Sequence, residues 1–316
     1  MTTTDVPART ARPSRPAVPK RRPRREREGA AWVFLSPWVL GATVLTLLPM
    51  AVSLYLSFTD YDLFNPPRWV GLRNYTQMFT EDPRYWRSVL TTLTYVVLAV
   101  PLQLALALLV AIALKSMKRG KAFYRSAFYA PSLLGASMSI ALVWRAVFND
   151  GGTVDNLFGT GGWVNKPGWA LLAVALLTVW QFGAPMVIFL AGLQQIPAEL
   201  YEAAAVDGAG TWRQFLSVTV PMLSPVLFFN LVLQTIQAFQ VFTPAFAVSA
   251  GKGGPADSTL VYTLYLYDRG FVASHMGYAS AMAWVLLLVI GAVTVVLFRT
   301  SRSWVFYASD TDGGAR

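Results

Sequence analysis

Four amide side chains lie at helical spacing in one apolar segment late in the chain: Asn230, Gln234, Gln237 and Gln240. At 100° per residue the first three lie within about 60° of one another on one helix face, and Gln240 widens the stripe to about 120°. Amides are costly to expose to lipid, so this face should point inward. Because amides both donate and accept hydrogen bonds, they suit sugar hydroxyls, and a row without charge argues against an ion path.

Two interpretations of this amide stripe stay open. The four side chains line a path for a polar solute, or they join neighbouring helices by hydrogen bonds. Gln181, in another apolar segment of the chain, is a further candidate for the path. An anionic solute would be better served by a cation there, and only Arg145 lies near a segment end, which favours a neutral sugar.

Composition places these residues in a membrane. Of 316 residues, 55% are hydrophobic and only 13% are charged, far from the balance of an ordinary soluble domain. Crossing a bilayer takes roughly 20 apolar residues. The sequence predicts an all-α integral membrane protein with six transmembrane helices, at residues 31–58, 88–114, 126–148, 169–193, 220–248 and 277–298. Cysteine is absent, so neither disulfides nor a thiol-based metal site is expected.

The uneven distribution of Lys and Arg predicts the topology. Residues 1–30 form a basic tail, expected to be disordered, that fixes orientation or holds anionic lipid headgroups. Residues 115–126 carry five cations and no acid. Because cytoplasmic loops carry the excess of Lys and Arg, both termini, including the tail 301–316, are predicted to be cytoplasmic, and residues 59–87 to form an outer loop.

A polar loop between two apolar segments, residues 196–225, is predicted to fold as a helix-turn-helix. Pro197 fits a first helical position, and the helix should stop at Asp207-Gly208, where glycine can adopt the left-handed conformation of a helix end. Thr211 and Gln214 have the spacing of a capping box, which predicts that Thr211 opens a second helix. An amphipathic helix lying on lipid is the alternative, but such helices usually carry more cations than the single Arg213.

The loop also resembles a known family. The run EAAAVDGAG at 202–210, followed by Phe215, Pro221 and Pro225, is similar to the EAA loop in the membrane subunits of ATP-binding-cassette (ABC) importers. In that family the loop is a cytoplasmic coupling helix that docks into a cleft on a separate ATPase subunit. The resemblance therefore implies a coupling role for Glu202, Ala203, Ala204, Asp207, Gly208, Phe215 and Pro221.

Further matches narrow the resemblance to one branch. SFTDYDL at 57–63, WVGLRNY at 69–75 and MGYASAMAWVL at 276–286 resemble the carbohydrate-uptake branch, of the maltose and glycerol-phosphate type, on the subunit with an extra N-terminal helix. The resemblance implies a type I importer permease fold, with a core of five transmembrane helices at 88–300. It also implies a multi-pass protein of the bacterial inner membrane.

The same resemblance implies an assembly that works by alternating access. Its expected members are a second homologous permease, two ATPase subunits and an extracytoplasmic solute-binding protein, all operating in membrane lipid. The chain has no GxxxxGK[ST] phosphate loop, because Gly120-Lys121 and Gly251-Lys252 lack the flanking residues. ATP and Mg are therefore expected on the partner ATPase, and no cofactor or metal on this chain.

Other classes of protein fit the sequence less well. An ion-coupled secondary transporter of small polar solutes usually keeps an ionisable group in mid-membrane, and a membrane enzyme needs clustered His, Asp or Glu at that depth. Neither pattern occurs. Binding to nucleic acid is not expected either, since Glu199, Glu202 and Asp207 outweigh Arg213 in the helix-turn-helix and would repel phosphate.

Overall fold

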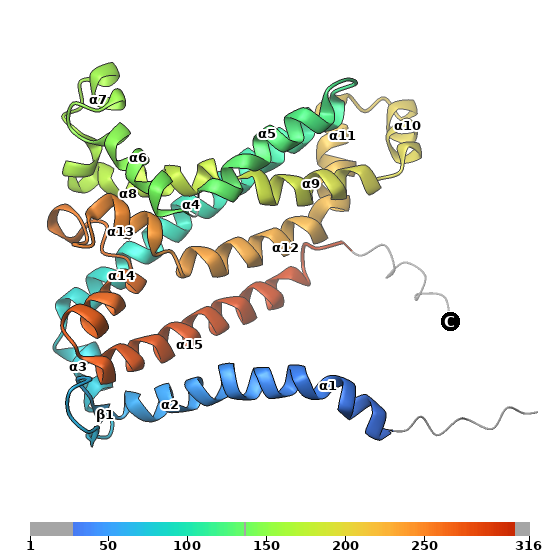
Figure 1. The fold of residues 1–316 in the computed structure, drawn as a ribbon. Coiled ribbons are helices and arrows are strands. Elements are labelled where there is room, and N and C mark those ends of the chain that lie inside the picture. The colour runs from blue at the N-terminus through green and yellow to red at the C-terminus, as the bar shows by residue number, and fades with distance from the viewer. Residues whose placement is uncertain (1–27, 136, 307–316) are drawn as a thin grey trace, which may run out of the picture. The chain divides into compact units, whose positions relative to one another are not determined.

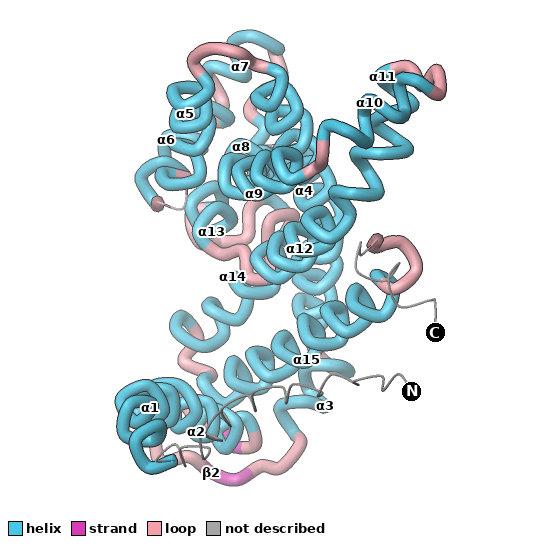
Figure 2. The backbone as a smooth tube through the Cα atoms, turned by 90° about the vertical axis from the view of Figure 1, so that its right-hand side faces the viewer, coloured by secondary structure: helices cyan, strands magenta, loops and turns pink. Residues whose placement is uncertain are grey.

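The computed structural model describes residues 28–306 except residue 136. Helices make up most of the described chain, and loops and one pair of two-residue strands make up the rest (Figure 2). It divides into two units, Met1–Ala51 and Val52–Arg316, and each is described by itself. The first contains α1 (Glu28–Ala42), the π-helical segment η1 (Thr43–Leu47) and the start of α2 (Leu48–Ser57).

The second unit begins with an antiparallel pair, β1 (Thr59–Asp60) and β2 (Arg68–Trp69), in which Thr59 faces Trp69. The helices and helical turns that follow are α3 (Arg73–Thr80), α4 (Pro83–Ser116), α5 (Lys121–Leu134), α6 (Met138–Phe148), α7 (Thr153–Phe158), η2 (Trp163–Asn165), α8 (Pro167–Trp180), α9 (Gly183–Gln195), α10 (Ala198–Val206), α11 (Thr211–Gln214), η3 (Phe215–Thr219), α12 (Val220–Phe239), α13 (Thr243–Ser249), η4 (Pro255–Asp257), α14 (Tyr262–Tyr267), η5 (Asp268–Val272) and α15 (Met276–Ser301).

Helix α4 is the central element of this unit, and it packs against α8, α9 and α12 (Figure 1). It has 34 residues and begins at Pro83, earlier than the predicted 88. At 1.5 Å per residue it is about 51 Å long, more than the roughly 30 Å of a bilayer core. Its buried face repeats every four residues, and the small alanines in it let neighbouring helices approach closely. These residues are Tyr95, Ala99, Gln103, Ala107 and Ala111.

Among the residues that the structure describes, four helical stretches are long and apolar enough to cross a membrane, or up to six if each of two bent pairs forms one span. One bent pair is α8 and α9, which meet at 45°. The bend directly precedes Gly183-Ala184-Pro185, because α9 begins at Gly183. Pro131, by contrast, lies inside α5, and that helix continues to Leu134.

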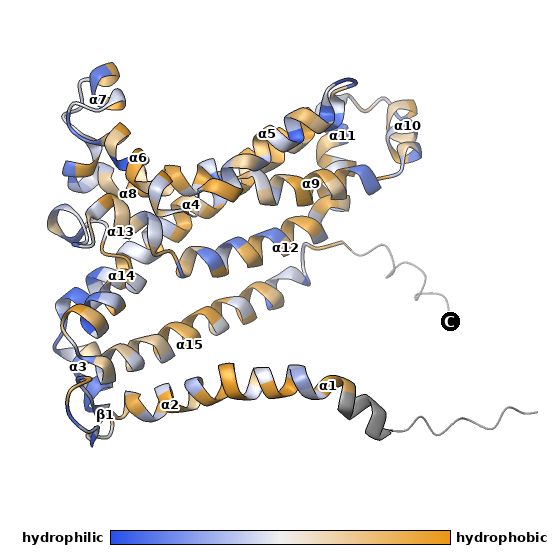
Figure 3. Cartoon of the chain, viewed as in Figure 1, coloured by the Kyte–Doolittle hydropathy of each residue, from blue (hydrophilic) through white to orange (hydrophobic). Residues whose placement is uncertain are grey.

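The predicted segment 220–248 is divided in the structure. Helix α12 ends at Phe239, and residues Thr243–Ser249 form the separate helix α13. Pro244 lies in the first turn of α13, where its missing N–H costs nothing, whereas the same residue would interrupt a continuing helix. In the second unit, the loop with α10 and α11 lies at the opposite end from α7 and α13, and hydrophilic residues gather at both ends (Figure 3).

Candidate functional site

A cavity of about 310 Å³ lies where α4, α12 and the junction of α8 with α9 meet. Of the predicted path residues, four line it: Gln181, Gln234, Gln237 and Gln240. Gln234 is buried, while Gln237 and Gln240 are exposed in the single chain. No lining residue, among those the structure describes, is charged. Amides, hydroxyls and one phenol therefore supply all the polar groups of this wall.

The bend between α8 and α9 places Gln181 at the cavity. The Gln181 carbonyl accepts hydrogen bonds from Ser132 Oγ at 2.8 Å and from Gln103 Nε2 at 3.3 Å. Ser132 Oγ in turn accepts from the Ala184 N–H at 3.0 Å. A helix bend leaves backbone groups without their usual partners, and here side chains from α4 and α5 satisfy them. The polar groups that line the cavity thus also hold the bend.

The absence of a side chain at Gly135 leaves room for the side chain of Gln181. A Cβ at position 135 would lie 2.3 Å from the Gln181 Cγ and 2.8 Å from the Pro131 carbonyl oxygen. Both distances are too short for non-bonded atoms. A side chain at 135 would therefore displace Gln181 from the cavity wall.

Asn230, the fifth predicted path residue, lies elsewhere. It is fully buried in α12 and does not line the cavity. Its side-chain nitrogen and oxygen have no hydrogen-bond partner among the described residues. An unpaired buried amide costs about 1–3 kcal/mol, so this position is expected to weaken the folded chain. Its role in the path stays a prediction.

Several cavity residues were not among the sequence candidates: Tyr95, Gln103, Ser132 and Thr178. Tyr95 is fully buried, and its hydroxyl lies 2.6 Å from Thr178 Oγ1 on α8. Gln103 carried a signal, since it is strongly polar inside an apolar segment. The other three did not, because single hydroxyls are common in membrane helices and their convergence depends on how α4, α5 and α8 pack.

At the far end of the bundle, residues 196–225 form the predicted helix-turn-helix. Helix α10 ends at Val206 with Asp207 as its C-cap, and the next residue, Gly208, has the expected left-handed conformation with a φ of +77°. The Gly208 N–H donates to the Ala205 carbonyl and the Ala209 N–H to the Ala204 carbonyl, which is the Schellman arrangement of a helix C-terminus. The prediction of a capping box at Thr211 is wrong. Gly210 is the N-cap of α11, without a side-chain cap. Gln214 Nε2 instead donates to the Ala209 carbonyl.

The residues to which a coupling role was assigned are mostly exposed on this loop. Glu202, Ala203, Asp207 and Gly208 are exposed, and Ala204 is half-buried. Phe215, in η3, and Pro221, in the first turn of α12, are half-buried at the base of the loop. Large apolar side chains are exposed beside them, with Val206 at 88% and Trp212 at 71%. An apolar surface of this kind at a polar end of a protein is typical of a docking site.

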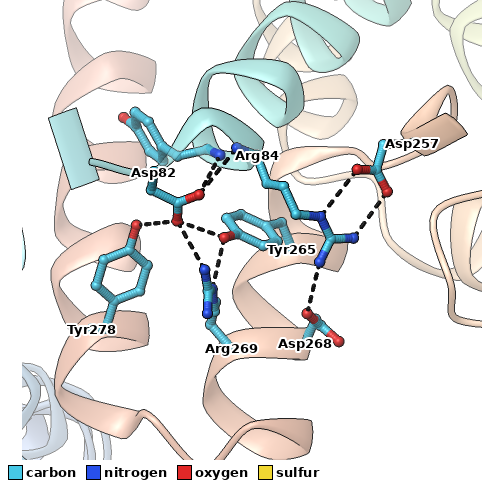
Figure 4. Close-up of polar contacts among 8 residues, drawn as sticks. Asp82, Arg84, Asp257, Tyr265, Asp268, Arg269 and Tyr278 are labelled. Carbon is cyan, nitrogen blue, oxygen red and sulfur yellow. Dashed lines mark hydrogen bonds and ion pairs between the residues drawn. The ribbon is translucent and has the colours of Figure 1, made fainter. Parts of the chain in front are cut away.

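A hydrogen-bonded cluster centred on Asp82 was not foreseen from the sequence (Figure 4). Asp82 caps α4 by accepting from the backbone N–H groups of Arg84 and Tyr85. Its other oxygen accepts from Tyr265 Oη at 2.5 Å, from Tyr278 Oη at 2.7 Å and from Arg269 at 3.2 Å. One buried carboxylate thus joins the start of α4 to α14, η5 and α15.

Arg84 extends the cluster on the exposed side (Figure 4). Its guanidinium group forms a two-pronged pair with Asp257 and lies 3.7 Å from Asp268. Exposed pairs of this kind contribute little, typically about 0–1 kcal/mol each. The buried carboxylate of Asp82 is therefore the main stabilising group here.

The surroundings of Asp82 keep it ionised. Burial by itself raises the pKa of its carboxyl, but the hydrogen bonds from Tyr265, Tyr278 and the Tyr85 N–H, with the charge of Arg269, outweigh burial and lower the pKa below its ordinary 3.8. A depressed pKa in the folded state contributes stability above the ordinary pKa. That contribution is lost as the pH falls through the lowered value.

Replacing Asp82 with Asn is expected to lower the free energy of unfolding at neutral pH, on the order of 3 kcal/mol, because Arg269 loses its partner and two phenols lose a charged acceptor. Thermal unfolding in detergent measures the change. The difference in unfolding free energy between wild type and variant should narrow as the pH falls below about 4, where the carboxyl of the unfolded chain protonates, and should vanish below the lowered pKa of the folded state. The control is Asp62→Asn, since among the described residues Asp62 bonds only to its neighbours Phe64 and Asn65. Equal losses of stability in the two variants would contradict the role given to Asp82.

Comparison with known proteins agrees with this architecture. The model of the family "binding-protein-dependent transport system inner membrane component" matches residues 80–307. The chain is 48% identical, over 93% of its length and 97% of the relative, to a protein of Bacillus subtilis named as the probable ABC transporter permease protein YesP. It is 30% identical to the lactose transport system permease protein LacF of Rhizobium radiobacter, over 86% of this chain and 93% of LacF.

A solved structure shares the fold. A chain of the bacterial alginate ABC transporter, crystallised in complex with an alginate pentasaccharide-bound periplasmic protein, superposes with a TM-score of 0.73. The superposition covers 87% of this chain and 95% of that chain, at 20% sequence identity. The type I importer permease fold expected from the sequence is therefore shared with a transporter subunit. The chain belongs to the family of inner membrane components of binding-protein-dependent transport systems, the permease subunits of ABC importers.

Proposed function

We propose that this chain forms, with a second homologous permease, the membrane path by which an ATP-driven importer takes up a sugar or related carbohydrate. Transport proceeds by alternating access. The observation that carries the proposal is the cavity of about 310 Å³, lined by four glutamines of the predicted path and by no charged residue among those the structure describes. Its volume lies at the lower end of the range typical of small-molecule sites.

The chemistry of the cavity supports a carbohydrate. Amide and hydroxyl groups offer paired donors and acceptors to sugar hydroxyls, and Phe242 and Pro244 add apolar contact in the same wall. The relative LacF is named for lactose transport. An ion-coupled carrier is not favoured, since such a path usually contains an ionisable group.

Energy for transport enters through the loop of α10 and α11. Its exposed acids, alanines and apolar side chains suit docking to an ATPase subunit, in which Glu202 pairs with a cation of the partner. In this topology the loop and both termini are cytoplasmic, in line with the cation-rich segment 115–126. A binding protein delivers the sugar at the opposite end, and ATP and Mg remain on the two ATPase subunits.

The proposal is tested by purification of the tagged chain from its native host in mild detergent, followed by mass spectrometry of the proteins that accompany it. An ATPase subunit and a second permease are expected with the wild type. Glu202→Lys should lose the ATPase, because two cations then face each other, but should keep the second permease. The matched control is Glu199→Lys, since Glu199 is also exposed on the same helix and the family resemblance assigns it no role.

Recovery of the chain alone, with solute uptake into liposomes in the absence of ATP, would overturn the proposal in favour of a carrier that works by itself. Retention of the ATPase by Glu202→Lys, or its loss from Glu199→Lys to the same degree, would place the docking contact elsewhere on the loop.

A further inference from the structure

One polar side chain of helix α10 contacts other helices of the second unit. None of its residues is buried, and only Tyr201 and Ala204 are even half-buried. Among the described residues, Tyr201 is the single α10 side chain with a hydrogen bond to another helix. Its hydroxyl lies 2.9 Å from Thr219 Oγ1 and accepts from Lys115 Nζ at 3.4 Å. The Lys115 ammonium also lies 4.7 Å from the centre of the Tyr201 ring.

The two partners of Tyr201 belong to the helices that form the cavity. Lys115 lies in the last turn of α4, the helix that supplies Tyr95 and Gln103 to the cavity wall. Thr219 directly precedes α12, the helix of Gln234 and Gln237. One phenol therefore contacts the ends of both helices, and a displacement of α10 reaches α4 and α12 together.

Thr219 also ends the π-helical segment η3. A π-helical turn holds one residue more than the α-helical pattern and is frequent at functional sites. Conversion of η3 to regular α-helix would turn the preceding chain by about 100° relative to α12, the angle of one residue. Thr219 is buried at 6% exposure, so its hydroxyl is fixed at the junction where such a turn would begin.

We propose that Tyr201 is the positioning residue that transmits movement of the coupling loop to the cavity helices, by holding Lys115 of α4 and Thr219 of η3 at once. The inference rests on the proposed function, because it assumes that an ATPase moves α10. It adds the point of force transfer within this chain, which lies on the inner side of α10 and is distinct from the docking surface around Glu202.

The test uses the complete importer in proteoliposomes and measures ATP hydrolysed per molecule of sugar transported. Tyr201→Phe keeps the ring and its contact with Lys115 but removes both hydrogen bonds of the hydroxyl. Loss of such a bond should raise the ratio about fivefold, with the ATPase subunit still copurifying and its basal rate unchanged. Thr219→Val removes the other half of the same bond, so it should raise the ratio similarly, and the double variant should be no worse than either single one.

Tyr124→Phe is the matched control, since Tyr124 is exposed and its hydroxyl has no hydrogen bond to a described residue. An unchanged ratio in both Tyr201→Phe and Thr219→Val would overturn the inference. Loss of the ATPase from Tyr201→Phe would overturn it too, by making Tyr201 a docking residue. If no ATPase subunit copurifies with the wild-type chain, it is the proposed function that is contradicted, and not the role of Tyr201 alone.

Discussion

Gly208→Thr is expected to reduce ATP-driven transport at least tenfold while the protein still inserts and keeps its second permease. Gly208 has a φ of +77°, a left-handed conformation that costs a β-branched residue on the order of 2 kcal/mol. The substitution should undo the Schellman hydrogen bonds at the end of α10 and misplace the docking surface. Transport assays in proteoliposomes, with copurification of the ATPase, measure the effect.

Gly210→Thr is the control for this variant. A Cβ at either glycine meets no atom within 4 Å, so crowding is excluded at both positions. Gly210, however, has a φ of −67° and a ψ of 168° and is the N-cap of α11, where Thr is tolerated well. The two variants therefore differ in backbone conformation alone. Equal losses of transport would show that the left-handed turn does not matter for coupling.

The double variant Gln234→Leu/Gln237→Leu is expected to lower transport at limiting sugar concentration by about 30-fold. Each amide that pairs with a sugar hydroxyl contributes about 1 kcal/mol, and 1.4 kcal/mol corresponds to a factor of ten. The Leu side chain is similar in size to that of Gln but has no group that donates or accepts a hydrogen bond. Uptake of labelled sugar should fall, whereas copurification of the partner subunits should not change.

Asn230→Leu is the contrasting variant on the same helix. Because the Asn230 amide is buried without a described partner, its removal is expected to raise the free energy of unfolding by about 1–3 kcal/mol and to leave uptake near that of the wild type. A loss of uptake as large as that of the double variant would place Asn230 in the path after all. Unchanged uptake in the double variant would show that the stripe joins helices instead.

Periodicity and helix-end chemistry explain what could be predicted from the sequence. The spacing of Gln234, Gln237 and Gln240 predicted a common inward face, and these three residues do meet at one cavity. Asp207-Gly208 predicted the end of α10, because few residues other than glycine adopt the conformation found there. These signals are local: they depend on one helix or one turn, whose geometry follows from neighbouring residues.

Contacts between distant segments depended on the tertiary structure. Tyr95 meets Thr178, Asp82 meets Tyr265 and Tyr278, and Lys115 meets Tyr201 only because α4 lies against helices that are far from it in the sequence. In an apolar sequence many packing arrangements bury similar side chains, so hydrophobicity alone does not select one. The sequence by itself determined the membrane class, the family and the helix-turn-helix of residues 196–225, whereas helix packing decided which polar groups share a cavity and which side chains Tyr201 contacts.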